Sequence, residues 1–241
     1  MLSTLRRAVL ALSLVLAATA VASPGGLNQG TSPLDLGAAL PGARFAADLP
    51  TLQDVTGVAP AERPLRPEEV LAWFRALADA SPRARLVEFG RTYEDRPLVY
   101  LAVSDEATIA DLDGFKARHR AIMDPRTGAA RGPADKPVAW MAYGIHGDEL
   151  SSTDAAAVLA WWLVAGDDDQ ARAVRDGVLV LIDPCENPDG RARYLAQTTA
   201  FAHRTANPDQ DDLAHRAVWP WGRGNHYLFD MNRDWFTMVN P

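Results

Sequence analysis

The sequence has a single cysteine, Cys185, and this excludes a disulfide within the chain. Stability must therefore come from packing, and 241 residues with 48% hydrophobic content are enough to build a core. No activating base stands beside Cys185 in the sequence. We therefore expect this residue to be a small buried filler rather than a reactive thiol.

Positive charge is also scarce. Lys and Arg together number 24 against 31 Asp and Glu, which gives a formal net charge of -7. No run of Lys and Arg interleaved with aromatic residues occurs anywhere in the chain. Because binding to a phosphate backbone needs a basic surface, we expect no nucleic-acid partner.

Long apolar runs are missing except at the start of the chain. Residues 1–22 contain Arg6 and Arg7, one apolar stretch and then Ala20-Val21-Ala22, which is typical of a cleaved export signal. The apolar stretch is shorter than the roughly 20 residues that span a bilayer. The sequence thus predicts a secreted or periplasmic protein with no membrane contact beyond this signal.

Residues 23–60 are rich in Pro, Gly and Ala, and we interpret them as an N-terminal arm before a domain at 61–241. Hydrophobic periodicity then predicts alternating helices and strands. The expected helices are 67–81, 109–123 and 151–165, and the expected strands are 85–89, 98–104, 138–143 and 178–183.

The strands at 138–143 and 178–183 are apolar throughout and are joined by the helix at 151–165. This order favours a parallel pair with a crossover helix. The sequence therefore predicts an α/β fold with a mixed, largely parallel twisted sheet and helices on both faces. Functional sites of such sheets lie where strands end, and His146 falls at such a position.

The stretch GIHGDE at 144–149 follows a predicted strand. His146 and Glu149 are three residues apart, so the first turn of a helix would place both on one side. Imidazole nitrogen and carboxylate oxygen are ligands that Zn²⁺ accepts. The alternative is a capping acid beside an unrelated histidine, and this stretch alone leaves both interpretations open.

Two further motifs follow in order, PCENPDGRARY at 184–194 and FDMNRDW at 229–235. Together with GIHGDE they resemble the zinc carboxypeptidases of the M14 peptidase family. The resemblance runs from about residue 60 and includes GRTYEDRPL, which is similar to an early hairpin of that family. It implies Zn²⁺ as cofactor and hydrolysis of the C-terminal peptide bond of a peptide or a peptidoglycan stem.

The resemblance implies a role for each motif residue. His146 and Glu149 match two of three zinc ligands, and Asp230 matches a carboxylate that receives the other ring N–H of the ligand histidine. The NPDG stretch at 187–190 matches a structural turn at the site wall.

The substrate contacts come from the later motif. Asn232 and Arg233 match the pair that grips the terminal carboxylate of the substrate, a task suited to the planar fork of a guanidinium. Arg204 matches the arginine that polarises the scissile carbonyl.

The family also needs a third zinc ligand and a catalytic glutamate beyond the second motif, and neither follows Arg233 in this sequence. We therefore expect a catalytically incomplete fragment with little turnover, although His226 stays open as a substitute ligand. Two other interpretations remain. One is a zinc deacylase of the aspartoacylase type, and the other is a secreted binding module without catalysis.

Overall fold

The computed structural model describes residues 35–203, 205, 207–215 and 218–240. The expected export signal, the first part of the arm and Arg204 therefore lie outside the described residues. Within the described part, no helix combines the length and the apolar character needed to cross a bilayer.

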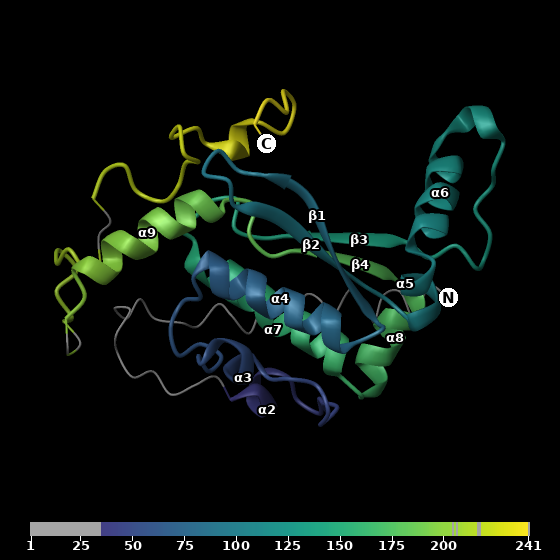
Figure 1. Cartoon of the computed structure of the whole chain (residues 1–241), viewed down its shortest axis with the longest axis horizontal. Coiled ribbons are helices and arrows are strands. Elements are labelled where there is room, and N and C mark those ends of the chain that lie inside the picture. Colours follow the sequence, from purple (N-terminus) through teal and green to yellow (C-terminus); the bar gives the residue numbers. More distant parts are fainter. Residues whose placement is uncertain (1–34, 204, 206, 216–217, 241) are drawn as a thin grey trace.

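The centre of the fold is a four-stranded sheet with the order β1-β2-β4-β3 (Figure 1). Its strands are β1 (Ala84–Arg91), β2 (Pro97–Val103), β3 (Val138–Ala142) and β4 (Leu179–Asp183). The mixed α/β class is thus confirmed. Among the described strands, only β3 and β4 pair in parallel, because the short GRTYEDRP turn makes β1 and β2 an antiparallel hairpin and β2 also runs antiparallel to β4.

Two long helices, α4 (Pro67–Ala80) and α7 (Leu150–Ala165), lie together against one face of the sheet (Figure 1). The periodicity of α4 buries Trp73, Phe74 and Leu77 completely, and the indole N–H of Trp73 donates to the Ala157 carbonyl of α7 at 3.1 Å. These contacts form the main core.

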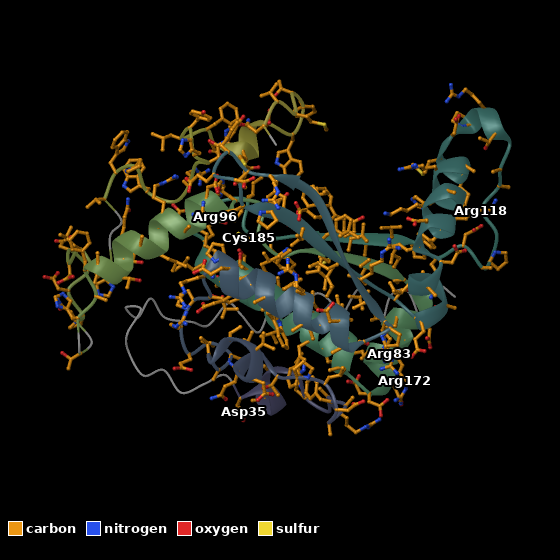
Figure 2. The ribbon with its side chains drawn as sticks, in the orientation of Figure 1. Asp35, Arg83, Arg96, Arg118, Arg172 and Cys185 are labelled. Carbon is orange, nitrogen blue, oxygen red and sulfur yellow. The ribbon has the colours of Figure 1, made fainter. Side chains whose placement is uncertain are left out.

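The opposite face carries a smaller core under α5 (Glu106–Ala110) and α6 (Leu112–Met123). The sequence predicted one helix here, but Asp111 accepts a hydrogen bond from the Gly114 amide and starts a new helix. Helix α6 and the turn η2 (Pro125–Thr127) project from the body, and Arg118 lies on this projection (Figures 1 and 2).

The arm contributes two short helices, α2 (Leu36–Ala39) and α3 (Leu52–Thr56). Its apolar side chains Leu40, Leu52 and Val58 are buried in the main core. The described part of the arm is therefore continuous with the domain that follows.

Besides α2 and α3 of the arm, the sequence analysis did not predict α8 (Asp169–Gly177) and α9 (Pro188–Ala200). Asn187 accepts a hydrogen bond from the Gly190 amide at 2.9 Å and caps α9, while Pro188 occupies its first turn. The NPDG stretch is therefore the start of a helix and not only a turn. A last short helix is η3 (Met231–Arg233).

Candidate metal and substrate site

His146 lies in the loop that leaves β3, at the end of the sheet where the sequence placed it. The prediction that His146 and Glu149 lie in the first turn of a helix is wrong, because α7 begins at Leu150 and Glu149 is its N-cap. Gly144 has a φ of +68°, which lets the chain turn sharply before His146. The two side chains nevertheless meet, with Nδ1 of His146 2.8 Å from Oε1 of Glu149.

Asp230 comes from a distant loop and approaches the other ring nitrogen. Its Oδ1 lies 3.1 Å from Nε2 of His146, whose side chain is only 6% exposed. When Nε2–H donates to Asp230, the lone pair of Nδ1 faces the carboxylate oxygen of Glu149. Two acceptors at such a distance need a proton or a cation between them, so this geometry suits a shared metal ion.

Arg223 also belongs to this cluster, although the sequence did not point to it. Its Nε and Nη2 each lie 3.0 Å from Oδ2 of Asp230, and its Nη1 lies 3.4 Å from Nδ1 of His146. Burial disfavours the charged form of Asp230, but the hydrogen bonds from His146 and Arg223 outweigh burial and lower the pKa of this carboxyl.

Glycine backbones bring the loops of the site together. The amide of Gly147 donates to the Gly222 carbonyl at 3.0 Å. A Cβ atom at Gly147 would lie 2.1 Å from the Arg191 amide nitrogen and 2.2 Å from the Gly190 carbonyl carbon. The site thus needs glycine after His146, because only a residue without a side chain allows this approach.

Side chains of α9 hold the same loops. Nδ2 of the buried Asn187 donates to the Ile145 carbonyl at 3.4 Å and to the Arg223 carbonyl at 3.1 Å. Arg193 donates to the carbonyls of Trp221 and Gly224 at 2.6 and 2.7 Å. Both contacts fix the loop that carries Arg223 against the first turns of α9.

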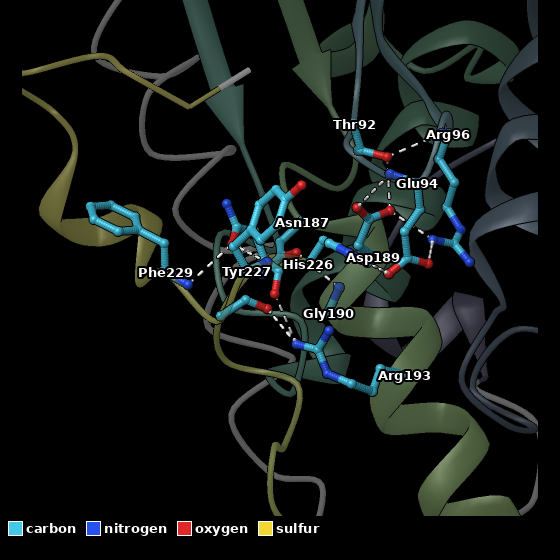
Figure 3. Close-up of polar contacts among 12 residues, drawn as sticks. Thr92, Glu94, Arg96, Asn187, Asp189, Gly190, Arg193, His226, Tyr227 and Phe229 are labelled. Atoms are coloured by element: carbon cyan, nitrogen blue, oxygen red, sulfur yellow. Dashed lines mark hydrogen bonds and ion pairs between the residues drawn. The ribbon is translucent and has the colours of Figure 1, made fainter.

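The β1–β2 turn is tied to α9 through Asp189, which is 1% exposed (Figure 3). This carboxylate accepts hydrogen bonds from Thr92 Oγ1 at 2.8 Å and from Arg96 Nη1 at 2.7 Å. His226 joins the same turn, with Nδ1 3.0 Å from Oε1 of Glu94. The described residues contain no group of three His, Cys, Asp or Glu side chains able to hold a metal, so His226 does not complete the site here.

Asn232 and Arg233 lie in η3, directly after Asp230. The Asn232 amide donates to Oδ1 of Asp230 at 3.0 Å, and its side-chain oxygen accepts from Trp235 Nε1 at 2.8 Å. The exposed guanidinium of Arg233 donates to the Asn232 carbonyl at 3.2 Å, and among the described residues it forms no ion pair. Asp230 therefore connects the histidine with the segment expected to bind a substrate carboxylate.

Two acids with raised pKa values lie at the end of β4 and just after it. Cys185 is buried, and burial raises the pKa of its thiol to about 11, which fits an unreactive filler (Figure 2). Burial raises the pKa of Asp183 to about 8, with a further contribution from the charge of Glu186. The pKa of Glu186 rises to about 7 for the same reason, desolvation.

Residues 70–240 match the family model of the zinc carboxypeptidases, Peptidase M14. The match covers well over half of the chain. The chain belongs to the zinc carboxypeptidase family. Solved carboxypeptidase structures are similar to it at low identity. The family implies zinc as its metal.

Two such structures illustrate the likeness. Carboxypeptidase A from Helicoverpa armigera is 23% identical, with a TM-score of 0.44 over 60% of this chain and 29% of that one. The metallo-carboxypeptidase from Burkholderia cenocepacia is 21% identical, with a TM-score of 0.44 over 71% of this chain and 33% of that one. The chain thus spans about a third of the length of these carboxypeptidases. A search of curated proteins finds no match.

Two of the residues that this carboxypeptidase-family chain provides suit zinc, although the described residues alone do not form a complete metal site. Nδ1 of His146 and Oε1 of Glu149 are close enough to share one ion, and both are donor atoms that zinc accepts. Asp230 lies 3.1 Å from the other ring nitrogen, where its carboxylate would accept a hydrogen bond from Nε2–H. Arg204 lies outside the described residues, so its expected role stays a prediction.

Proposed function

We propose that this chain is part of a secreted or periplasmic zinc carboxypeptidase and supplies two metal ligands and the clamp for the substrate's terminal carboxylate. The observation that carries the proposal is the pairing of His146 Nδ1 with Glu149 at 2.8 Å while Nε2 contacts Asp230. The family match supports the carboxypeptidase interpretation over the deacylase and the binding module. The location rests on the export signal that the sequence of residues 1–22 predicts.

The metal ligands are His146 and Glu149 in this proposal. Asp230 keeps the proton of the ring on Nε2, which leaves Nδ1 free for the metal and increases the basicity of the imidazole. When bound, zinc lowers the pKa of a coordinated water to about 7 and polarises a carbonyl oxygen.

The substrate clamp is formed by Asn232 and Arg233. The guanidinium of Arg233 is exposed and has no carboxylate partner among the described residues, so its two parallel N–H groups are available for a carboxylate. The amide of Asn232 leads back to Asp230, so the clamp and the ligand histidine are joined by one carboxylate. This arrangement restricts attack to the end of a peptide, and Arg204 is expected to stabilise charge on the scissile carbonyl.

Hydrolysis of blocked dipeptides tests the substrate part of the proposal. It is measured on this chain together with any segment that follows it in its gene, with and without a chelator. We expect release of the C-terminal amino acid, loss of release with the chelator and recovery on adding zinc. Arg233→Ala should raise KM by about 100-fold, as expected for a lost charge-assisted fork worth about 3 kcal/mol.

A substrate that lacks its free carboxylate is the matched control. A C-terminally amidated dipeptide should be cleaved poorly by the unmodified enzyme, and Arg233→Ala should change its cleavage little. Equal losses on both substrates would show that Arg233 is structural. Comparing a protein-derived peptide with a peptidoglycan stem peptide then distinguishes the two sources of a free C-terminus.

A further inference from the structure

Strand β3 forms one edge of the sheet, and no described strand pairs with its outer side (Figure 1). The carbonyl of Pro137 and the amide of Tyr143 both bond to the backbone of β4, at 3.0 Å each. Alternate residues of a strand bond to the same neighbour, so the odd-numbered residues of β3 face β4. The N–H and C=O groups of Val138, Trp140 and Ala142 therefore point outward from the open edge.

The surface beside this edge is apolar. Trp140, at the centre of β3, is 55% exposed and meets Trp235 edge to face, with 6.2 Å between the ring centroids. Phe236 and Met238 follow Trp235 in the chain and are 99% and 77% exposed. An unpaired strand edge next to exposed aromatic side chains is a surface suited to association with another polypeptide.

The outward-facing residues are arranged symmetrically about Trp140. If β3 of a second copy runs antiparallel along this edge, Trp140 faces the partner's Trp140 and Val138 faces the partner's Ala142. Residues that face each other in this way exchange two hydrogen bonds in an antiparallel ladder. The edge of β3 is thus complementary to its own copy, as a two-fold symmetric interface requires.

The charges at the two ends of β3 favour the antiparallel direction. Residues 115–131 contain five Lys or Arg and one acid, and Arg118 of this segment bonds to Asp135, just before the strand (Figure 1). The loops that follow β3 and β4, residues 143–149 and 183–187, contain four acids and neither Lys nor Arg. Antiparallel pairing brings the basic end of one copy to the acidic end of the other, whereas parallel pairing would bring like charges together.

We propose that this chain forms a two-fold symmetric dimer in which β3 pairs antiparallel with β3 of a second copy. The two four-stranded sheets then join into one continuous sheet across the symmetry axis. Directly opposite residues of a ladder lie on the same face, so the two Trp140 rings cover each other. This inference goes beyond the proposed function, because the strand pairing requires neither metal nor substrate.

Sedimentation velocity of the whole chain over a wide range of concentrations tests the dimer. Trp140→Lys and Trp140→Glu each place like charges opposite each other and remove the aromatic contact, so each should weaken association by about tenfold or more. Mixing the two variants should restore the dimer, because Lys then faces Glu. Trp219→Lys is the matched control, since Trp219 is 70% exposed on a loop away from β3, and it should dimerise as the unmodified chain does.

A monomeric unmodified chain overturns the proposal, and so does a dimer that Trp140→Lys leaves intact. A mixture of the two variants that stays monomeric overturns the two-fold register. If the Trp140 variants do not fold, Ala142→Pro repeats the test, because it removes an outward N–H that β4 does not use. The chain is also measured together with any segment that follows it in its gene. A monomer there would mean that the protein covers the edge of β3 itself, which also overturns the proposal.

Discussion

Asp183 holds a carboxylate at the end of β4 where it costs stability. The residue is 3% exposed, and its Oδ1 has no hydrogen-bond partner among the described residues. Burial, together with the nearby charge of Glu186, raises the pKa of Asp183 from 3.8 to about 8. Replacing it by asparagine keeps the shape and removes the ionisable group, so Asp183→Asn should stabilise the protein at neutral pH.

The size and sign of this stability change follow from the linkage between proton binding and folding. Between pH 4 and pH 8 the folded state keeps a proton that the unfolded state releases, so the free energy of unfolding falls as pH rises through this window. One pKa unit corresponds to about 1.36 kcal/mol, which gives a gain of about 4 kcal/mol for Asp183→Asn at pH 7 and almost none at pH 3. Above pH 8 the gain should reach a plateau.

Urea unfolding at a series of pH values measures this difference. Asp176→Asn is the control, because Asp176 is an exposed acid on α8 and its loss should change stability by a few tenths of a kcal/mol. A gain for Asp183→Asn that is independent of pH, or a loss at pH 7, would show that burial does not disfavour the charged form of Asp183 and would refute the reasoning.

Three further predictions concern other parts of the molecule. Gly147→Ala should lower the free energy of unfolding by about 3 kcal/mol in urea, because its Cβ would collide with backbone of α9; equal stability would mean that the loops can separate freely. Asp189→Asn should cost about 2–4 kcal/mol in the same assay by breaking the buried pair with Arg96, and Thr92→Val should cost less. Burial opposes ionisation of Glu69, but hydrogen bonds from Arg63 and Arg66 lower its pKa to about 2. The Glu69 carboxylate therefore stabilises the folded state above pH 4.5, and this stabilisation is lost as pH falls towards 2. Glu69→Gln should lower the free energy of unfolding at pH 6 and match the unmodified protein at pH 2. A difference that does not change with pH would contradict this.

The regular parts of the fold could be predicted from the sequence because their signals are local. Helix α4 and strands β1 to β4 follow from apolar spacing and from Pro67 at a helix start. Helix α8 was missed because DQARAVRDG offers few apolar residues, and its stability comes from the Asp168 cap and the burial of Ala171 and Val174.

Only those residues of the candidate site that belong to recognisable sequence motifs could be predicted. His146, Glu149 and Asp230 converge, and the resemblance to a family placed them together before any coordinates did. Arg223 could not be found in this way, because its contacts depend on how the loop before Asp230 folds back over α9. Pairings between residues far apart in sequence leave no local pattern.

The close contact of Gly147 with the backbone of Gly190 and Gly222 joins the loops of the candidate site through main chain alone. Main chain packed on main chain has no rotamers to reorganise, so side chains carried by these loops can be exchanged without moving their neighbours. Position 223 is then a suitable place to engineer a new donor, such as a histidine, against a ligand pair that stays where it is.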